Sequence, residues 1–434
     1  MRVVVVGAGL AGLFTACELI AQGIDDVVVV DAASHPGGIT RSIVRDGYTL
    51  EPGAGSFVLP HPDLSPLLAR VGAEVIPATS AVRHIYTDNG LLALPASPRA
   101  LLAPVVAIAA KARALLEPAI RSKSPPEESL DSFCRRRFGS SAGEMLAWLM
   151  ASGVFAGDPR RLSVEAAFPA LLALEGNGSV LFGAVRKRRA RTDRRPTAHI
   201  PVGGMAGLAG SAANFLGDRL RTNFRVESVY EADGGWVVTG PQALAADAVV
   251  IAVDPSVAAA VLAGDLSALL MKAASAPVAV VGLGGSDDDS RIPEGFGALV
   301  HSSDTMIVRG VLFESSYAPA RAPDGSWLLK VIAGGATAPE VVDWEDVPLV
   351  ERVVSEASRI VGVDLNPKFL AVVRHRRGIP QYEIGHMGWL DQVDALVASR
   401  SGLALTGWGY RGVGVAHVAS DARAVASRLA GNAA

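Results

Sequence analysis

The chain has 434 residues, half of them hydrophobic, with 40 Lys and Arg against 43 Asp and Glu. That length exceeds one ordinary domain, so about two or three domains are expected. The formal net charge of −3 gives no overall attraction to nucleic acid, and we expect no nucleic-acid partner. Only Cys17 and Cys134 occur, far apart, which argues against a disulfide framework and favours two buried thiols in the reducing cytoplasm.

The N-terminal residues follow the pattern of a βαβ unit. A β-branched run over Arg2–Val6 predicts a strand, Leu10–Gln22 predicts a helix and Val27–Asp31 predicts a second strand. The chain enters this strand without the basic region and cleavage site of a signal peptide, so no secretion is expected.

Three glycines between the first strand and the helix form the pattern G-x-G-x-x-G. Gly7 permits the turn, Gly9 lets the backbone approach a pyrophosphate, and Gly12 lets helix and strand pack closely. Asp31 follows Gly12 by 19 residues, where a carboxylate accepts hydrogen bonds from an adenosine ribose. Ala32 and the alanine after it offer no cation for a 2′-phosphate, which argues against NADP. The predicted contacts of this unit are Gly7, Ala8, Gly9, Leu10, Ala11, Gly12, Asp31 and Ala32.

The rest of the chain alternates between helical and strand patterns. Residues from about 97 to 195 have helical spacing and few strand signals. Alternating apolar residues from 276 to 333 predict a second sheet. Further strands are predicted at Arg225–Tyr230, Gly235–Thr239, Asp247–Ala252 and Leu403–Thr406, and further helices at Glu351–Val361 and Ala416–Leu429.

Two stretches allow two interpretations each. Leu101–Ile120 is apolar but interrupted by prolines and cations, so it falls short of a membrane span. It is either a helix packed on its own domain or an amphipathic helix on a membrane surface. Arg186–Arg195 carries seven cations in ten residues and is either a solvated loop or a contact for anionic lipid headgroups.

Further segments identify the nucleotide. Residues 36–42, PGGITRS, resemble the second signature of the FAD-dependent amine-oxidase superfamily. Residues 201–205, PVGGM, resemble its middle portion, after which the backbone at Val226 would meet the adenine. Residues 407–415, GWGYRGVGV, resemble its closing flavin segment, so the resemblance implies FAD as cofactor. The further cofactor contacts that it implies are Gly37, Gly38, Thr40, Arg41, Gly53, Ala54, Gly55, Ser56, Val226, Trp408, Val413, Gly414 and Val415.

Three other blocks resemble the porphyrinogen oxidase family. They are GVFAGDPRRLSVEAAFPALLALE at 153–175, GIPQYEIGH at 378–386 and GAGSF at 53–57. The resemblance implies oxygen-dependent oxidation of protoporphyrinogen IX or coproporphyrinogen III in haem biosynthesis, by repeated hydride transfer to FAD with release of hydrogen peroxide. It implies that Arg83 holds a substrate propionate and that Gly153 leaves room for the macrocycle. Gly153 has a second interpretation as the residue that ends a helix.

The family resemblance also implies a fold class and a domain division. We expect an α/β chain with an α+β substrate domain, in which a discontinuous Rossmann-type FAD-binding domain contains two insertions. The expected FAD-binding domain comprises residues 1–80, 200–262 and 400–434. The substrate-binding sheet domain comprises 81–96 and 263–399, and the mainly helical domain comprises 97–199.

The chain departs from these relatives at Trp408, at Ala416-His417-Val418 and at Asp31, where they more often have Glu. One alternative is therefore a flavin amine oxidase or desaturase acting on another substrate, although the aliphatic Val413 argues against an amine cage. A non-catalytic flavin-bound carrier is a second alternative.

The sequence shows no pattern for metal or nucleophilic catalysis. The eight histidines have no ligand spacing, and no G-x-S-x-G motif occurs, so we expect neither a metal nor a side-chain catalytic base. The expected partners are a porphyrinogen and dioxygen, for a monomer or homodimer in the cytoplasm. Contact with the inner face of the cell membrane stays open. Structural or exposed roles are expected for His84, His199, His375 and His386.

Overall fold

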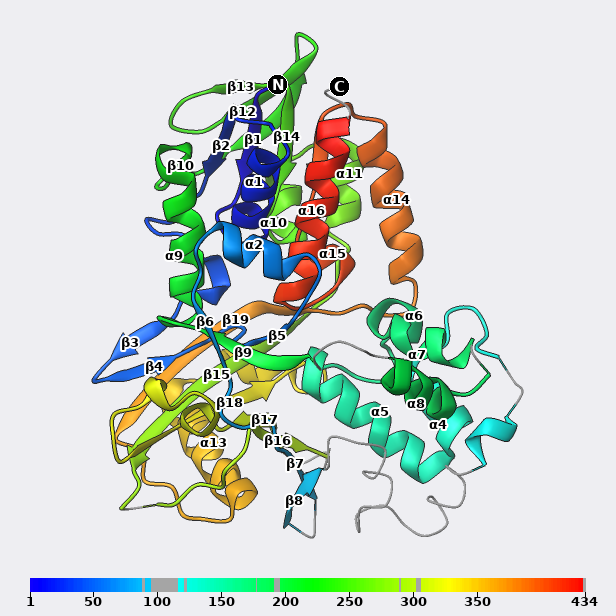
Figure 1. The fold of residues 1–434 in the computed structure, drawn as a ribbon, viewed down its shortest axis with the longest axis vertical. Coiled ribbons are helices and arrows are strands. Elements are labelled where there is room, and N and C mark those ends of the chain that lie inside the picture. The colour runs from blue at the N-terminus through cyan, green and yellow to red at the C-terminus, as the bar shows by residue number, and fades with distance from the viewer. Residues whose placement is uncertain are drawn as a thin grey trace.

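The computed structural model describes residues 1–87, 90–94, 116–120, 123–176, 178–190, 196–288, 290–301 and 306–431. The apolar stretch Leu101–Ile120 and the basic stretch Arg186–Arg195 lie mostly or partly outside these residues, so their interpretations stay predictions. The described elements form three groups: a nucleotide-binding group at the top of Figure 1, a large sheet at the lower left and a set of helices at the lower right.

The nucleotide-binding group contains a parallel sheet of five strands in the order β10-β2-β1-β14-β20. Its central strands are nearly pure valine because a parallel sheet covered on both faces buries every side chain. Val3 and Val5 belong to the core on one face, and Val4 and Val6 to the core on the other. The predicted βαβ start is confirmed by β1, α1 and β2. The strands are β1 (Val3–Val6), β2 (Val27–Val30), β10 (Leu220–Arg221), β14 (Ala248–Ile251) and β20 (Leu403–Leu405).

Helices cover both faces of this sheet (Figure 1). One face carries α1 (Leu10–Ala21), α2 (Leu64–Arg70), α9 (Gly204–Leu216) and α16 (Val415–Gly431), the last preceded by the short α15 (Trp408–Arg411). The other face carries α10 (Pro255–Val261), α11 (Gly264–Leu270), α14 (His386–Ala398) and the antiparallel strands β11 (Ser228–Ala232), β12 (Gly235–Thr239) and β13 (Leu244–Ala246).

The predicted strand over Arg225–Tyr230 is placed too early, because β11 begins at Ser228. The residues before it bind the turn that follows β2. The Phe224 N–H donates to the Asp31 carbonyl at 2.7 Å, and the Asn223 N–H donates to the Ala33 carbonyl at 2.8 Å. These bonds hold the chain beside Asp31, so Val226 lies in a loop rather than in a strand.

The second group is a sheet of seven strands in the order β19-β15-β18-β17-β16-β7-β8. Helix α13 (Asp346–Val361) packs on it through Leu349, Val353, Ala357 and Ile360, which lie on one side of a helix. The strands are β7 (Arg83–Thr87), β8 (Gly90–Leu94), β15 (Ser275–Ser286), β16 (Gly297–Val300), β17 (Val308–Leu312), β18 (Ser326–Gly334) and β19 (Phe369–Pro380).

Short elements connect the two sheets. Two small sheets are formed by β3 (Ile43–Arg45) with β4 (Tyr48–Leu50), and by β5 (Phe57–Leu59), β9 (Thr197–Pro201) and β6 (Val75–Pro77). Tyr48 and Leu50 of β4 pack on Leu328 and Phe369 of the seven-stranded sheet. Helix α12 (Glu314–Tyr317) and the 3-10 turn η5 (Pro319–Arg321) lie between β17 and β18 in the chain.

The third group consists of helices. They are α4 (Leu130–Phe138), α5 (Ser140–Phe155), α6 (Val164–Ala167), α7 (Pro169–Glu175) and α8 (Val180–Ala190), with a 3-10 turn η3 at Glu117–Ala119. Their shared core includes Leu130, Phe133, Phe155 and Leu162, and it also contains Tyr382 from outside the helices.

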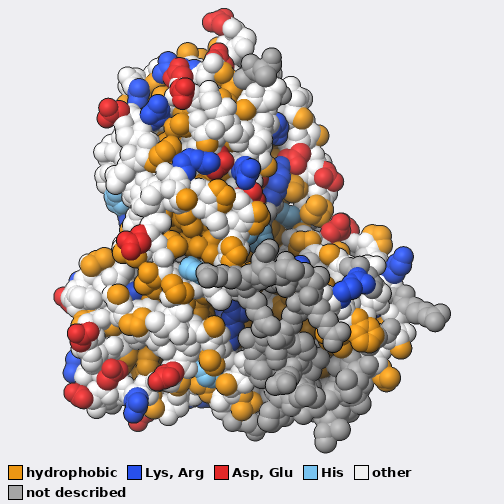
Figure 2. Space-filling model, in the orientation of Figure 1, with side chains coloured by type: hydrophobic (Ala, Val, Ile, Leu, Met, Phe, Trp, Pro, Cys, Tyr) orange, Lys and Arg blue, Asp and Glu red, His pale blue; other side chains and the backbone are white. Residues whose placement is uncertain are grey.

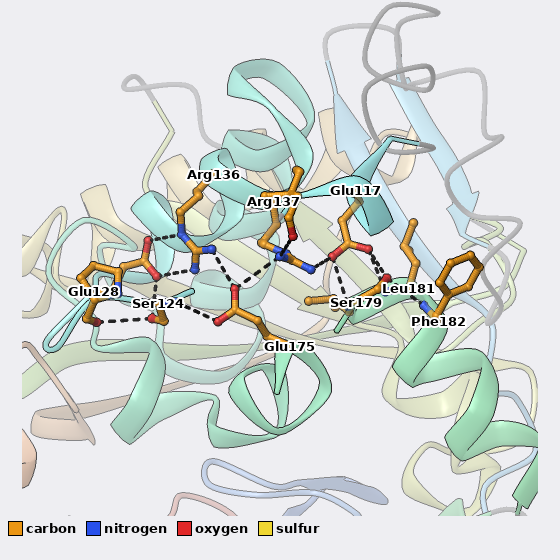
Figure 3. A network of polar contacts seen from close by, with 12 residues as sticks. Glu117, Ser124, Glu128, Arg136, Arg137, Glu175, Ser179, Leu181 and Phe182 are labelled. Carbon is orange, nitrogen blue, oxygen red and sulfur yellow. Dashed lines mark hydrogen bonds and ion pairs between the residues drawn. The ribbon is translucent and has the colours of Figure 1, made fainter. Parts of the chain in front are cut away.

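A buried ionic network fastens these helices together (Figure 3). Glu117 of η3 pairs with Arg137 of α4, and its carboxylate also accepts from Ser179 Oγ and from two N–H groups at the start of α8. Arg136 donates to Glu128 at 2.8 and 2.9 Å and to Glu175 at 2.7 Å. Glu117 and Arg137 are almost fully buried, so each charge depends on the other.

The surface of the upper group carries charges of both signs. Figure 2 shows basic and acidic side chains interspersed over this group on the face in view. Among the described residues, no helix is long and apolar enough to cross a membrane.

Candidate functional site

The G-x-G-x-x-G turn uses its three glycines in three ways. Gly7 has a φ of 105°, and a Cβ there would lie 2.9 Å from the Ala252 carbonyl oxygen. A Cβ at Gly12 would lie 1.8 Å from the Gly7 carbonyl oxygen, so α1 packs this closely only with glycine. Gly9 is the N-cap of α1, with no atom within 4 Å of its Cβ position and no side chain capping the helix. The first turn of α1 therefore presents N–H groups that suit a pyrophosphate.

The Asp31 carboxylate lies at the end of β2 and binds the glycine turn after β1 as well as the turn after β2. Oδ2 accepts a hydrogen bond from the Ala8 N–H at 2.6 Å, and Oδ1 accepts one from the Ala33 N–H at 2.7 Å. A carboxylate oxygen accepts about two hydrogen bonds, so each oxygen can also receive a ribose hydroxyl. Ala32 is exposed beside this carboxylate, and the loop with Val226 reaches the same edge.

The second glycine pair lies against the first turn. Gly37 has a φ of 112° and Gly38 a φ of 56°, and the Gly37 N–H donates to the Ala8 carbonyl at 2.8 Å. A Cβ at Gly38 would lie 3.3 Å from the Cα of Gly9. The 3-10 turn η1 (Gly38–Thr40) follows, and the exposed Arg41 next to it contacts His35 Nε2 at 2.9 Å. Two glycine turns thus meet at the start of α1, and Arg41 follows the second turn in the chain, an arrangement that fits an anionic ligand.

The loop of residues 53–56 is held by two cations from the second group. Arg321 donates to the Gly55 carbonyl at 2.5 Å. Lys330 of β18 donates to the carbonyls of Glu51 at 3.0 Å and Gly53 at 3.2 Å. A Cβ at Gly55 would lie 3.0 Å from Arg321 Nη1 and 3.2 Å from Lys330 Nζ, so glycine allows both cations to approach the backbone.

The cations that hold this loop belong to a buried ionic cluster. Glu314 pairs with Lys330 at 3.0 Å and with Arg321, whose Nη1 also donates to the Tyr317 hydroxyl at 2.9 Å. Burial raises the pKa of the Glu314 carboxyl, but the two cations outweigh burial and hold that pKa below its ordinary value. Sequence reasoning missed this cluster, because its members lie more than 250 residues from the loop.

Glu51 fastens the start of α9 to the same region. Its carboxylate accepts from the Met205 N–H and the Ser42 hydroxyl, both at 2.9 Å, while the Ala206 N–H donates to Ser42 Oγ at 3.1 Å. Burial raises the pKa of Glu51, and this effect exceeds the opposing ones of Arg321, the Met205 N–H and Ser42. The predicted segment at 201–205 therefore meets the residues that follow the second glycine pair.

The segment at 407–415, which is predicted to contact the flavin, contains two turns between β20 and α16. Gly407 has a φ of 127° and Gly412 a φ of 124°. Asp421 of α16 holds the first turn by accepting from Thr406 Oγ1 at 2.7 Å and from the Gly407 N–H at 3.0 Å. His417, one of the departures from the relatives, contacts the Val413 carbonyl at 2.8 Å. Trp408 and Val413 are half-buried, Gly414 has a φ of 110°, and Val415 begins α16.

The blocks at 153–163 and 378–386 pack on each other. Gln381 Nε2 donates to the Phe155 carbonyl at 2.8 Å. The Ser163 N–H donates to the Tyr382 carbonyl, and the Ile384 N–H donates to the Arg161 carbonyl, both at 2.9 Å. A Cβ at Gly157 would lie 2.6 Å from Gln381 Oε1. Glycine at 157 therefore allows this close contact between the two blocks.

The two predicted substrate residues approach one strand. Arg83 of β7 is exposed, pairs in register with Gly297 of β16, and lies 5.7 Å from the centroid of the Phe296 ring. Gly153 of α5 is exposed, and a Cβ there would lie 3.1 Å from Leu299 Cδ1 of β16. The structure thus brings both residues to β16.

The interpretation of Gly153 as the end of a helix is wrong. Helix α5 continues to Phe155, and its C-cap is Ala156, whose φ of 44° is left-handed. The missing side chain at Gly153 instead lets the last turn of α5 pack closely on Leu299.

The remaining candidate side chains have structural surroundings. Both cysteines are buried and free, and burial raises the pKa of Cys17 and of Cys134 to about 12. His375 Nε2 contacts the Pro52 carbonyl at 3.2 Å, and burial lowers its pKa. Within the described ranges, no group of three or more His, Cys, Asp or Glu is arranged to hold a metal ion.

Comparison with known proteins identifies the class of this fold and site. The family described as flavin containing amine oxidoreductase matches residues 10–430, and the chain belongs to it. The protein is an FAD-dependent oxidase with an α/β fold.

Within this class, the chain belongs to the protoporphyrinogen and coproporphyrinogen oxidase family. It is 30% identical to the chloroplastic protoporphyrinogen oxidase of Oryza sativa subsp. japonica over 93% of this chain and 82% of that protein. It is 26% identical to the coproporphyrinogen III oxidase of Bacillus subtilis strain 168 over 98% and 97%. A crystal structure from Exiguobacterium sp. 255-15, provisionally assigned as a protoporphyrinogen oxidase, has the same fold, with a TM-score of 0.84, 21% identity and 99% coverage of both chains.

Proposed function

We propose that this protein oxidises a porphyrinogen, either protoporphyrinogen IX or coproporphyrinogen III, to the porphyrin in haem biosynthesis. Dioxygen would reoxidise the flavin with release of hydrogen peroxide. One observation carries the proposal: the blocks at 153–163 and 378–386, which resemble porphyrinogen oxidases, pack together beside the closing flavin segment. The names of the rice and Bacillus relatives support the same substrate class.

The residues present fit FAD at the sequence-predicted positions. We propose that the uncapped start of α1 holds the pyrophosphate, that Asp31 holds the ribose and that the backbone at Val226 meets the adenine. Arg41 would neutralise phosphate, and the loop 53–56 and the segment 407–415 would surround the flavin ring. Bound FAD supplies the hydride-accepting chemistry, and the protein orients the substrate and cofactor.

For the substrate, we propose that Arg83 binds a propionate arm and that Gly153 leaves space beside it. A porphyrinogen is a wide, mostly apolar molecule with carboxylate arms, so a cation beside apolar walls suits it. Arg83 of β7 supplies an exposed guanidinium next to Phe296 and pairs in register with Gly297 of β16. Gly153 of α5 approaches Leu299, two residues after Gly297 on β16.

The substrate is tested by turnover in air. Purified protein with bound FAD is mixed with protoporphyrinogen IX or coproporphyrinogen III, and porphyrin fluorescence and hydrogen peroxide are recorded together. We expect fluorescence from at least one substrate, and the ratio of initial rates identifies the preferred one. Turnover of neither, with the flavin still bound, would overturn the proposal, and oxidation of an amine instead would support the flavin amine oxidase alternative.

Arg83→Ala tests the substrate role separately from the cofactor. Loss of one charge-assisted hydrogen bond should raise KM roughly tenfold while FAD content stays unchanged. Arg376→Ala is the matched control, because Arg376 is 71% exposed and its ion pair with Asp343 lies at the surface of β19. Equal KM values for Arg83→Ala, Arg376→Ala and the wild type would remove Arg83 from the substrate site.

We also propose the domain division given above, with helices α11 and α14 moved to the FAD-binding domain because they pack on its five-stranded sheet. We further propose a cytoplasmic location, with peripheral contact at the inner face of the membrane. The sheet orders support the division, since strands from 83–94 and 275–380 share one sheet. Flotation with anionic vesicles tests the membrane contact, and absence from the vesicle fraction at low salt would contradict it.

A further inference from the structure

The proposed flavin-contacting segment contains a helix of only one turn. Helix α15 has four residues, Trp408–Arg411, between Gly407 and Gly412, and both glycines have left-handed backbone. A helix of one turn satisfies few of its own N–H and C=O groups and is not stable by itself. Its backbone shape must therefore depend on side chains from elsewhere.

The Tyr382 hydroxyl bridges the two ends of this turn. It donates to the Trp408 carbonyl at one end and accepts from the Gly412 N–H at 2.7 Å at the other. His386, four residues later, contacts the Tyr410 carbonyl in the middle of the turn at 3.0 Å. Two side chains of the block at 378–386 thus bind three backbone groups of the turn.

Tyr382 is itself firmly held. It is 2% exposed, its ring stacks on His386 with centroids 4.2 Å apart, and its other ring neighbour is Phe155 at 5.6 Å. Its backbone carbonyl accepts from the Ser163 N–H at 2.9 Å. Burial raises the pKa of the Tyr382 phenol, so the hydroxyl stays protonated and available as a donor. The position of Tyr382 is therefore set by the block at 153–163.

We propose that Tyr382 is a positioning residue for FAD, whose hydroxyl fixes the backbone spacing from Trp408 to Gly412 and thereby couples the end of α5 to the flavin site. This inference rests on the assignment of residues 407–415 to the ring end of FAD. It gives the blocks at 153–163 and 378–386 a role in shaping the cofactor site, in addition to the substrate role proposed for Gly153.

The test is Tyr382→Phe, which keeps the aromatic ring and removes only the hydroxyl. We expect roughly tenfold weaker FAD binding, as two hydrogen bonds of ordinary strength are lost. We also expect shifted absorption bands of the bound flavin at saturating FAD, because the backbone around the ring changes. Both are measured by titration of the apoprotein with FAD, without turnover.

Tyr410→Phe is the matched control. Tyr410 lies in the same turn and is 1% exposed, and its hydroxyl has no hydrogen-bond partner among the described residues. Its removal should change the FAD dissociation constant by less than about twofold. If Tyr382→Phe fails to fold, His386→Leu replaces it and should weaken FAD binding about threefold, since one contact is lost.

The outcomes separate the inference from its basis. FAD affinity and absorption bands equal to wild type in Tyr382→Phe, or in His386→Leu where that variant replaces it, would overturn the positioning role. Equal losses in Tyr382→Phe and Tyr410→Phe would overturn it too, because the bridging hydroxyl would then not be the cause. A wild-type chain that binds no FAD would instead overturn the assignment of the cofactor on which the inference rests.

Discussion

Replacement of Lys330 by methionine should destabilise the protein strongly at neutral pH. The Lys330 ammonium is buried, pairs with Glu314 at 3.0 Å and donates to the carbonyls of Glu51 and Gly53. Methionine fills a similar volume, so the main effect is a buried carboxylate left with one cation, Arg321, instead of two. Removal of one partner of a buried pair costs about 3–5 kcal/mol, a large share of the ~5–15 kcal/mol that stabilises a typical protein.

The pH dependence of this loss tests its electrostatic cause. In the wild type the two cations hold the pKa of Glu314 below its ordinary value. Without Lys330, burial shifts the pKa of Glu314 upward. As the pH falls, the Glu314 carboxyl of the variant becomes protonated, and the neutral carboxyl destabilises the folded state less than the carboxylate does. The difference in free energy of unfolding between Lys330→Met and wild type should therefore shrink between pH 7 and pH 5.

Urea unfolding of both proteins at several pH values measures this difference. Lys272→Met is the control, because Lys272 is exposed, and it should lose less than about 0.5 kcal/mol at every pH. The double variant Lys330→Met/Glu314→Gln should recover part of the loss, because a neutral amide then replaces the buried carboxylate that has lost one of its two cations. A loss for Lys330→Met that is the same at pH 5 and pH 7 would refute the electrostatic explanation and leave only altered packing.

Two further predictions concern the glycine turn and the ionic network of the helices. Gly12→Ala should abolish FAD binding, since the new Cβ would lie 1.8 Å from the Gly7 carbonyl; an FAD titration checks this, and tight binding would contradict the packing role of Gly12. Burial raises the pKa of Glu117 and of Glu128, but hydrogen bonds and arginines outweigh it, so both pKa values are lowered. Their contribution to the free energy of unfolding should be complete above about pH 4.3 and lost at lower pH. In urea unfolding, Glu117→Gln should lose less stability than the wild type as the pH falls below this value, and an equal loss in the two proteins would contradict the role of Glu117.

The nucleotide-binding start could be predicted because its causes are local. The valine runs, the glycines at 7, 9 and 12 and the carboxylate at 31 all act on neighbours within one βαβ unit. The same reasoning placed a strand at 225–230 three residues too early, because a tertiary contact to Asp31 holds Phe224 and delays the strand. It also allowed Gly153 as a helix end, whereas Ala156 adopts the left-handed turn that sequence patterns assign to glycine.

The side-chain contacts that hold the backbone of the site could not be predicted, because each contact joins residues that are distant in the chain. Lys330 and Glu51 show no local signal, and a charged residue in a strand pattern is usually exposed. Only the seven-stranded sheet brings Lys330 beneath the loop at 53–55. Family resemblance marked the block with Tyr382 but could not show that its hydroxyl reaches residues 408 and 412.

These contacts follow one principle of construction: the backbone of the nucleotide-binding group forms the proposed FAD site, and side chains from the other groups hold that backbone. Lys330 and Arg321 come from the large-sheet group and bind the loop at 53–55. Tyr382, anchored by the helices, binds the turn at 408–412. Because FAD would bind only the assembled form, its binding and the docking of the three groups are thermodynamically linked. Substitutions of these anchoring side chains, such as Lys330→Met and Tyr382→Phe, should therefore weaken FAD binding without touching FAD, and saturating FAD should restore part of the stability that they remove.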